Sequence, residues 1–301
     1  MKFQIVNSGR PEANLPFLAI SLPTDGKRTD SMWASRQLRG SIQLPVRWVG
    51  CLPGGDHVVD RQKLYEGKAK ILYATDNPEV LISYFKDDAT AFNAQKRGQI
   101  TDKGKLNCAI ATHLFKVLAA AGIPTHWLET PNEREMRVQA VKIIPLEVVV
   151  RNLAAGSLCQ QTGLDLGTPL EPPLVEFYYK NDDLGDPLLT RDRIKAMNLA
   201  DEAQIETLVR LAEQINQVLQ DFFQQCQITL VDFKLEFGLN HQNQIILADE
   251  ISPDTCRLWD QSETSLSDRI LDKDRFRKDL GQVAEAYQKV LQRILAQGSL
   301  S

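Results

Sequence analysis

Apolar residues recur every three or four positions in three long segments of the chain, and this spacing predicts helices. The segments are Lys105–Ala121, Asp201–Gln225 and Asp274–Leu295. Gly122 follows the first segment and Pro124 lies just beyond it, and both residue types are typical of a helix C-terminus. The sequence therefore predicts one helix in the first half of the chain and two in the second.

Shorter runs rich in β-branched and aromatic residues predict strands between these helices. Lys63–Thr75 and Val80–Lys86 flank the turn-like sequence Asp76-Asn77-Pro78, which predicts a first β-hairpin. Ile228–Leu239 and Gln244–Ile251 predict a second hairpin that turns near His241. The remaining strand candidates are Met136–Ile144 and Glu147–Arg151.

Strands dominate the first half of the chain, whereas strands and helices mix in the second half. This order predicts a two-lobed α+β enzyme, with antiparallel sheets, flanking helices and a cleft between the lobes. We assign residues 62–144 to the N-terminal lobe and residues 145–301 to the C-terminal lobe. Residues 1–61 carry five prolines and six glycines without a lasting period, which predicts an irregular N-terminal extension. A targeting peptide, an unusual extension and a wrongly chosen start codon are the alternatives for that segment.

Composition narrows the class of protein. Of 301 residues, 43% are hydrophobic and 25% are charged, which excludes a disordered tail, a collagen-like fibre and a coiled-coil rod. No apolar run approaches the roughly 18–20 residues of a membrane-spanning helix. A net charge of −4 gives no electrostatic reason to bind nucleic acid or an anionic membrane. Five widely spaced cysteines without a C-x-x-C pair indicate reduced thiols, so we expect a soluble cytoplasmic protein.

The strand candidate 230–238 carries an unusual row of charges. Alternation along a strand places Asp232, Lys234 and Glu236 on one face. The apolar residues between them then point into a core: Val231, Phe233, Leu235 and Phe237. Charges on an otherwise apolar strand are costly unless something pairs with them or uses them.

The returning strand of this hairpin brings Asp249 to the same face. If the hairpin turns tightly at His241, Asp249 lies opposite Lys234 and diagonal to Glu236. Glu236 and Asp249 would then form a carboxylate pair suited to Mg²⁺, with Lys234 placed to neutralise phosphate. The alternative is a solvated strand face with cross-strand ion pairs.

Three further segments carry candidate binding residues. Gly67 precedes two same-face lysines, Lys68 and Lys70, which could cover a polyphosphate, although exposed strand lysines also protect sheet edges. The segment Arg151–Ser157 ends a strand and opens a helix, which suits either an anion pocket or an ordinary helix cap. The segment Ser252–Arg257 follows the second hairpin directly. It places Asp254 and Arg257 at the mouth of the proposed metal site, whereas Cys256 has no histidine near it in sequence and is interpreted as a bystander thiol.

Four motifs, in this order, resemble the phosphoribosylaminoimidazole-succinocarboxamide synthase (SAICAR synthetase) family, and the resemblance runs from about Gln62 to Leu295. The motifs are Tyr65-Glu-Gly-Lys-Ala-Lys70, Val149-Val-Arg-Asn-Leu-Ala-Ala-Gly-Ser157, Val231-Asp-Phe-Lys-Leu-Glu-Phe-Gly238 and Asp249-Glu-Ile-Ser-Pro-Asp-Thr-Cys-Arg-Leu-Trp-Asp260. Any one short motif could arise by chance, but four long ones in order are very specific.

The resemblance implies a carbon–nitrogen ligase of purine biosynthesis. Such an enzyme joins the carboxylate of an aminoimidazole ribonucleotide (CAIR) to the amine of L-aspartate, and it converts ATP to ADP and phosphate through an acyl phosphate. ATP is then the cosubstrate and Mg²⁺ the cofactor, and the fold resembles the ATP-grasp and kinase kind, with an ATP-covering N-terminal lobe. The partners implied are the small molecules CAIR and L-aspartate. A homo-oligomer is compatible with a small metabolic enzyme, and no segment indicates its interface.

The resemblance also implies site residues, which we carry over position by position. They are Lys68, Lys70, Lys142 and Lys180 for ATP, with the backbone of 142–144 reading adenine; Lys234 and Asp232 for catalysis; Glu236 and Asp249 for Mg²⁺; and Asn93, Arg151, Ser157, Asp254 and Arg257 for CAIR. Asn93 stands where some members of the family carry aspartate, so it can bond a hydroxyl or an amine but not as an anion. No motif indicates the L-aspartate pocket or a general base.

Two other functions remain as alternatives. A kinase of the inositol-phosphate type would also use an Asp-x-Lys strand near a hairpin, but it would phosphorylate a hydroxyl and would have no use for L-aspartate. A non-enzymatic nucleotide sensor would bind ATP without needing the Glu236 and Asp249 pair.

Overall fold

The computed structural model describes residues 61–91 and 95–297. The predicted irregular extension therefore lies outside the described residues, except for Arg61. Five antiparallel strands form a first sheet in the order β1-β2-β3-β7-β6. Their bounds are β1 Lys63–Glu66, β2 Lys70–Ala74, β3 Val80–Phe85, β6 Trp127–Asn132 and β7 Glu135–Gln139.

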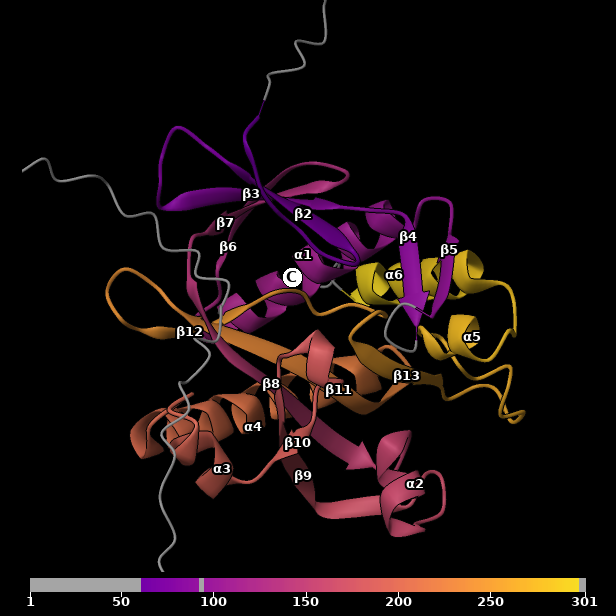
Figure 1. Cartoon of the computed structure of the whole chain (residues 1–301). Helices are drawn as coiled ribbons and strands as arrows, with labels where there is room; N and C mark the ends of the chain where they lie inside the picture. The colour runs from indigo at the N-terminus through magenta and orange to yellow at the C-terminus, as the bar shows by residue number, and fades with distance from the viewer. Residues whose placement is uncertain (1–60, 92–94, 298–301) are drawn as a thin grey trace, which may run out of the picture. The chain divides into compact units, whose positions relative to one another are not determined.

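The second sheet is built from the rest of the chain and is also antiparallel (Figure 1). Its order is β10-β9-β8-β11-β12, and β13 pairs with β11 beyond the end of β12. The bounds are β8 Lys142–Leu153, β9 Pro169–Tyr179, β10 Leu188–Leu189, β11 Ile228–Leu239, β12 Ile245–Ala248 and β13 Cys256–Asp260. A separate two-stranded ribbon consists of β4 Asp88–Ala91 and β5 Lys96–Gln99.

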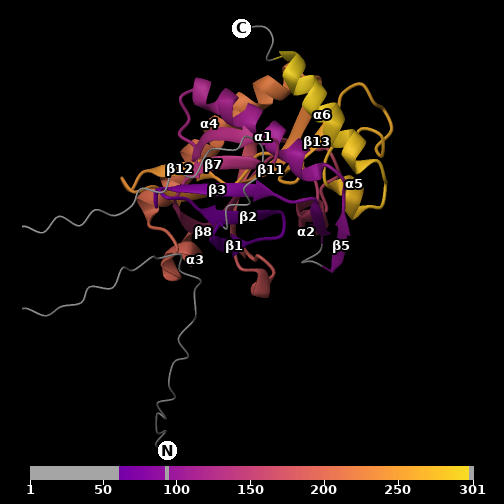
Figure 2. The same ribbon diagram turned by 90° about the horizontal axis from the view of Figure 1, so that it is seen from above.

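The helices α1, α4 and α6 lie together on one side of the sheets (Figure 2). The helical elements are α1 Lys103–Ala120, α2 Ser157–Thr162, the 3₁₀ turn η1 Asp182–Leu184, α3 Arg191–Ala196, α4 Glu202–Gln225, α5 Asp274–Arg277 and α6 Val283–Gln297. The predicted start of α4 is confirmed, because Asp201 and Gln204 form a reciprocal capping box at its N-terminus. None of the helices among the described residues is long and apolar enough to cross a membrane.

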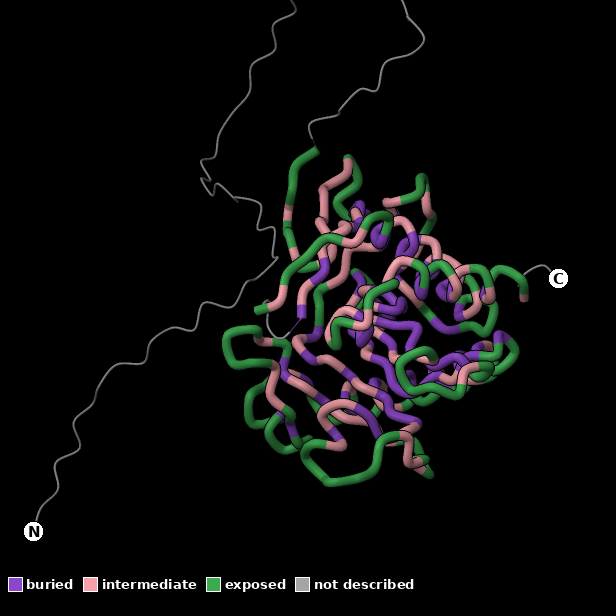
Figure 3. The backbone as a smooth tube through the Cα atoms, turned by 90° about the vertical axis from the view of Figure 1, so that its right-hand side faces the viewer, coloured by how far each residue is buried: buried purple, intermediate pink, exposed green. Residues whose placement is uncertain are grey.

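The main core lies between the second sheet and these helices. Val148 and Val150 of β8 and Phe233 and Leu235 of β11 are fully buried against it. The helices contribute further buried side chains to the same layer: Leu114, Leu118, Leu208, Ile215, Leu219 and Tyr287. Figure 3 shows that the buried positions are concentrated in the interior, while exposed positions follow the connecting loops. Each fully buried leucine or phenylalanine contributes about 1.5–3 kcal/mol, so this layer holds the opposite face of the sheet in a fixed position.

A short segment after α1 connects the two sheets. The backbone N–H of His126 donates to the carbonyl of Leu247 in β12 over 2.8 Å, and the N–H of Gln139 in β7 donates to the carbonyl of His126 over 2.7 Å. The N–H of Leu247 donates in turn to the carbonyl of Pro124. These backbone bonds link β7 of the first sheet to β12 of the second.

Two predicted strand boundaries are wrong. The predicted strand Lys63–Thr75 is itself a hairpin, because Gly67 donates its N–H to the carbonyl of Lys70 and separates β1 from β2. The predicted strand Met136–Ile144 covers the end of β7 and the start of β8, which belong to different sheets, and the predicted strand Glu147–Arg151 continues β8 beyond Pro145. Proline, which has no N–H, is tolerated there because it falls in the bulge of the ladder between β8 and β11.

The predicted helix Asp274–Leu295 is also wrong, since α5 and α6 are separate helices. Asp279, Gly281 and Gln282 between them all have positive φ, which an α-helix does not allow.

The alternation predicted along β11 holds for all but one of its residues. Phe233, Leu235 and Phe237 face the main core, as predicted. Val231 is buried, but it packs in a second, smaller cluster with Trp259. The ladder to β13 is irregular between Leu230 and Asp232, and such a bulge changes which face the following side chains occupy.

Gly238 allows the connection between the two sheets to pass close to β11. A Cβ at this position would lie 2.6 Å from Cγ2 of Val141, in the connection from β7 to β8. We predict that Gly238→Ala lowers the free energy of unfolding by about 1–3 kcal/mol in urea titrations, because Val141 must move. In a Val141→Ala background the same substitution should cost much less. Additive losses in the double variant would contradict this explanation.

Candidate functional site

The face of the second sheet that is turned away from α4 carries a row of polar side chains on three neighbouring strands. Glu236 of β11 lies opposite Glu147 of β8, and Asp232 lies opposite Arg151. Because side chains alternate along each strand, the same face also carries Lys234, Glu176 and Tyr178. The predicted charge row on β11 is therefore confirmed, and it continues onto β8 and β9.

Lys234 lies at the centre of one half of this row. Its Nζ is 2.6 Å from Oε1 of Glu236, 3.2 Å from Oε1 of Glu147 and 3.5 Å from Oδ2 of Asp249. Burial by itself lowers the pKa of this lysine, but the carboxylates outweigh it and raise the pKa well above its ordinary value. Lys234 is therefore a fixed positive charge that three acidic side chains hold in place.

The backbone conformation that brings Asp249 to Lys234 differs from the one predicted from the sequence. The predicted register set Asp249 opposite Lys234. In the structure Ala248 lies opposite Glu236, so the hairpin is shifted by one residue from that prediction. Extended backbone would then point Asp249 to the core face beside Leu235. Its φ is instead 60°, in the left-handed region, and this turn brings the carboxylate back to the polar face.

A buried histidine supports this turn. Nε2 of His126 lies 3.1 Å from the backbone carbonyl oxygen of Asp249, and the ring packs edge-on against Phe115. Burial lowers the pKa of His126 to about 4, so the neutral ring can donate Nε2–H to that carbonyl. His126 lies in the segment that connects the two sheets, so the position of Asp249 depends on both.

Two lysines from other elements extend the network. Lys70 of β2 pairs with Asp249, and its Nζ also lies 3.0 Å from Oε1 of Glu250. Lys180, just after β9, places its Nζ 2.6 Å from Oε1 of Glu236. Although burial raises the pKa of Asp249, the nearby lysines hold it well below its usual range. The network therefore joins the first sheet to the second through buried or half-buried ion pairs.

Lys68 does not share these partners. It lies in the turn between β1 and β2, and its Nζ is 2.6 Å from Oδ1 of Asp182 in η1. Both side chains are exposed, so this pair contributes little to stability and can open at low cost.

In the other half of the row, two arginines donate hydrogen bonds to the same carboxylate oxygen. Oδ2 of Asp232 accepts from Nη1 of Arg151 over 2.9 Å and from Nη1 of Arg257 over 2.7 Å. Nε of Arg151 donates to Glu176 over 2.7 Å, and Nε of Arg257 donates to Asp274 over 3.1 Å. Each guanidinium is thus fixed by two carboxylates, and its remaining N–H groups are available to an anion or to neighbouring oxygens.

The start of α2 closes around these arginines. Nη2 of Arg151 donates to Oγ of Ser157 over 3.2 Å. Gly156 has a φ of 58°, and a Cβ there would lie only 2.5 Å from Nη2 of Arg257. Only glycine lets the backbone approach the guanidinium this closely. The structure therefore brings together Arg151, Ser157 and Arg257, three of the five residues expected at the nucleotide substrate.

Asp254, the fourth of those residues, is held by the protein itself. Its Oδ2 accepts from Lys103 over 2.5 Å and its Oδ1 from the hydroxyl of Tyr287 over 2.7 Å. Asp254 and Lys103 are almost fully buried. Asn93, the fifth, lies outside the described residues.

Among the residues expected at ATP, Lys142 is exposed at the start of β8, opposite Leu239. Sequence reasoning missed Glu147, Glu250 and His126. Glu147 could have been predicted from the sequence. It lies four residues before Arg151 on β8, so the two side chains share one face, as Asp232 and Glu236 do on β11. The roles of His126 and Glu250 depend on contacts between distant segments, and no local pattern indicates them.

Glu236 and Asp249 both approach Nζ of Lys234 with carboxylate oxygens, and two carboxylates are a donor set that fits Mg²⁺. Mg²⁺ usually takes one or two carboxylates and completes its shell with phosphate oxygens and water. Two further acidic side chains of the network, Glu147 and Glu250, are each engaged by a lysine.

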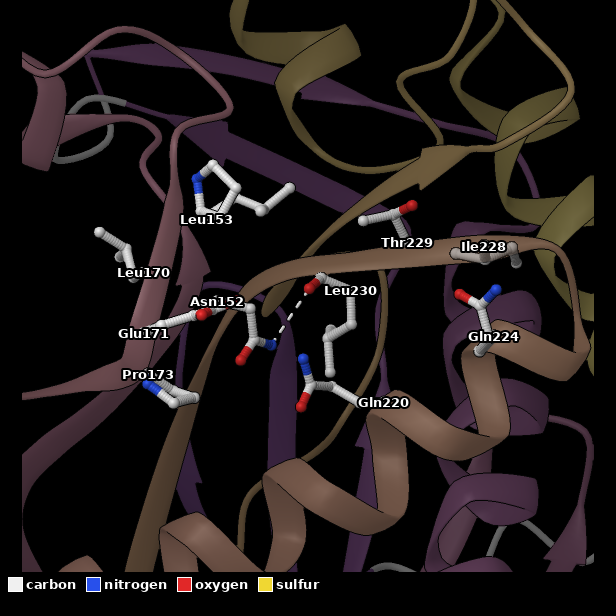
Figure 4. Close-up of a pocket in the computed structure, with 11 residues that line it drawn as sticks. Asn152, Leu153, Leu170, Glu171, Pro173, Gln220, Gln224, Ile228, Thr229 and Leu230 are labelled. Carbon is white, nitrogen blue, oxygen red and sulfur yellow. Dashed lines mark hydrogen bonds between the residues drawn. The ribbon is translucent and has the colours of Figure 1, made fainter.

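A pocket of about 290 Å³ lies elsewhere, at the far end of β8 and on the helix side of the sheet (Figure 4). Asn152 there donates to the carbonyl of Leu230 over 3.1 Å and to Oδ1 of Asn216 over 2.9 Å. Gln220 accepts from Asn216 over 3.3 Å. Asn152 and Asn216 thus donate to each other, and none of the expected site residues lines the pocket.

Known proteins are similar to this chain in sequence and in fold. A family model described as SAICAR synthetase matches residues 63–294. A phosphoribosylaminoimidazole-succinocarboxamide synthase of Acaryochloris marina is 67% identical over 234 residues, which is 78% of this chain and 96% of the relative. The crystal structure of such a synthase from Ehrlichia chaffeensis is 46% identical with a TM-score of 0.75, covering 78% of this chain and 99% of that one. A SAICAR synthetase in complex with ADP is 43% identical with a TM-score of 0.73, covering 76% and 96%.

By fold and by sequence, the described residues are thus those of a carbon–nitrogen ligase. The chain belongs to the SAICAR synthetase family. The resemblance inferred from the four motifs is confirmed, and so is the predicted α+β class with antiparallel sheets and flanking helices.

A buried carboxylate behind the arginine pair holds the segment before α5. Oδ2 of Asp272 accepts from the N–H of Leu258 over 2.8 Å, and Oδ1 accepts from the N–H of Asp274 over 2.8 Å. Burial, together with the negative charge of Asp274, raises the pKa of Asp272 to about 7. Asp272 therefore orients Asp274, which in turn fixes Arg257.

This shift predicts a specific pH dependence of stability. Because the folded pKa of Asp272 lies above its unfolded value of about 3.9, the folded chain binds more protons between about pH 4 and pH 7, and this contribution to stability falls as pH rises. The difference in unfolding free energy between the wild type and Asp272→Asn, measured by urea titration, should therefore decrease from pH 5 to pH 7. A difference that is constant with pH would contradict the assignment.

Proposed function

We propose that this chain is an ATP-dependent ligase that joins the carboxylate of CAIR to the amine of L-aspartate and releases SAICAR, ADP and phosphate. The observation that carries the proposal is that the lysine–carboxylate network and the arginine pair lie side by side on one sheet face. Lys234 and Asp232 are two residues apart on β11, and same-face positions are about 6.6 Å apart along a strand. A phosphoryl donor at Lys234 and an anionic acceptor at the arginines would therefore be within reach of each other.

The chemistry explains why a ligase needs both halves. A carboxylate is a poor acyl donor because an oxide would have to leave, so one carboxylate oxygen of CAIR first takes the γ-phosphoryl group of ATP, and ADP leaves. The amine of L-aspartate then attacks the acyl carbon, the C–O bond to phosphate breaks, and the amine loses a proton as the amide forms. The protein must hold several anions together and neutralise charge on the transferring group.

The lysines and carboxylates suit the ATP side of this reaction. Lys68, Lys70 and Lys180 would turn from Asp182, Asp249 and Glu236 to the phosphates, and Lys142 with the backbone of 142–144 would lie at the adenine. Lys234 would remain as the fixed charge beside the transferring phosphoryl group. Glu236 and Asp249 would hold Mg²⁺, which supplies further neutralisation of phosphate charge.

The arginine pair suits the ribonucleotide side. Arg151 and Arg257 would grip an anionic group of CAIR with Ser157, and Asp232 would act by keeping both guanidinium groups in place. Asp254 would contribute by anchoring the segment before Arg257 to α1 and α6. Asn93 keeps its expected place beside the nucleotide as a prediction.

A direct test is ADP release by the purified chain with ATP, Mg²⁺ and CAIR, with and without L-aspartate, while the succinocarboxamide product is followed. We expect ADP and product to form together only when L-aspartate is present. ADP formed without L-aspartate would indicate a kinase or an uncoupled acyl phosphate, and nucleotide binding without turnover would indicate a sensor.

Arg257→Lys tests the placement of the arginines. Lysine keeps the charge but cannot make the paired hydrogen bonds, so we expect the KM for CAIR to rise about 10–100-fold. The KM for ATP should stay within about threefold, since Lys234 and its carboxylates are untouched. Steady-state kinetics with each substrate varied in turn checks this, and an equal rise in both KM values would show that Arg257 is misplaced.

A further inference from the structure

Glu250 carries a charge that has no role in the proposed reaction. It follows Asp249 directly, and its side chain is only 3% exposed. Its Oε1 lies 3.0 Å from Nζ of Lys70. Its Oε2 is buried and has no hydrogen-bond partner among the residues that the structure describes. A buried carboxylate oxygen without a partner is costly, so the residue type at this position requires a reason.

The burial of the three side chains shows how they are arranged. Lys70 and Asp249 are 16% and 18% exposed, whereas Glu250 is almost completely buried. On the inner side, the negative charge of Glu250 adds to burial in raising the pKa of Cys108 in α1 to about 12. Glu250 therefore lies behind Lys70, on the side of α1, whereas Asp249 contacts Lys70 from the side that also faces Lys234.

The two carboxylates cannot both keep Lys70 once the site is loaded. An ammonium group and Mg²⁺ compete for the same oxygens of Asp249, because two cations on one carboxylate repel each other. Lys70 makes the direct hydrogen bond to Asp249, whereas Nζ of Lys234 lies 3.5 Å from it, so Lys70 is the ammonium group that Mg²⁺ would displace. Glu250 is the carboxylate that would still contact Lys70.

We propose that Glu250 is a positioning residue that retains Lys70 at the phosphate site while Mg²⁺ takes the carboxylate of Asp249. This inference rests on the proposed function, since it assumes Mg²⁺ at Asp249. In this role Glu250 keeps the two cations apart. It binds Lys70 and so leaves the carboxylate of Asp249 to the metal ion.

The substitution Glu250→Gln removes the charge but keeps the size and one acceptor oxygen. Lys70 then depends on Asp249 as its remaining carboxylate, and Mg²⁺ must displace it. We expect the Mg²⁺ concentration that half-saturates Mg²⁺-dependent ADP binding to rise about tenfold, as the loss of one charged contact implies. ADP binding without Mg²⁺ should change far less.

The experiment is a calorimetric titration of ADP into the full chain at a series of MgCl₂ concentrations. Asp260→Asn is the matched control, because Asp260 is a fully buried carboxylate paired with Lys289 and Arg293 and belongs to neither half of the site. It should lower the melting temperature without moving the Mg²⁺ midpoint. In a Lys70→Met background, Glu250→Gln should no longer shift the midpoint, since its effect passes through Lys70.

Each result bears on the inference separately from the proposed function. A Mg²⁺ midpoint unchanged by Glu250→Gln, or a shift that persists in the Lys70→Met background, would overturn the role of Glu250 and leave the ligase proposal standing. ADP binding that is independent of Mg²⁺ in the wild type would instead overturn the metal site and this inference together. Glu250→Asp keeps the charge on a shorter side chain, and it serves as a second variant in case Glu250→Gln does not fold. Loss of folding in both would assign Glu250 to stability alone and overturn the proposal.

Discussion

The ion pairs around Lys234 are the constraint on which the rest of the site depends. A half-buried lysine on an otherwise apolar strand is stable only when carboxylates surround it, and here they come from β11, from β8 and from the end of β12. Each of those carboxylates in turn has to be placed by its own element. The register of β8 with β11, the left-handed turn at Asp249 and the bond from His126 all serve this one cluster of charges.

The same principle explains the arginine half of the site. Two guanidinium groups converge on one oxygen of Asp232, and their like charges are tolerated because Glu176 and Asp274 approach from the outer sides. In the chain without substrates, the protein's charges thus pair with one another. In the proposed reaction, phosphate groups would replace the carboxylate partners of Lys68, Lys70 and Lys180, whereas Asp232 would keep its two arginines.

Much of the site could be read from the sequence, because its central part is local. The alternation of charge on β11 identifies Asp232, Lys234 and Glu236 as neighbours on one face, and the hairpin brings Asp249 near them. The exact register could not be predicted, since it depends on a turn residue with positive φ that alternation does not reveal.

The features that the sequence did not predict depend on contacts between distant segments or on local backbone conformation. Lys70 and Glu250 are 180 positions apart in the chain, and only the packed fold brings them into contact. The break between α5 and α6 lies in a segment whose apolar spacing alone is helical, but whose backbone adopts positive φ at three residues. Likewise, a single bulge in β11 moves Val231 to a different cluster from the one its spacing predicts.

In the proposed reaction, the two halves of one sheet face bring a phosphoryl donor to a carboxylate and so activate it as an acyl phosphate. The most direct test uses CAIR labelled with ¹⁸O in both carboxylate oxygens, with ATP, Mg²⁺ and L-aspartate, and mass analysis of the released phosphate and of the product. We expect one labelled oxygen in the inorganic phosphate and the other in the amide carbonyl of the product. Phosphate that carries no label, with product formed at the normal rate, would contradict it.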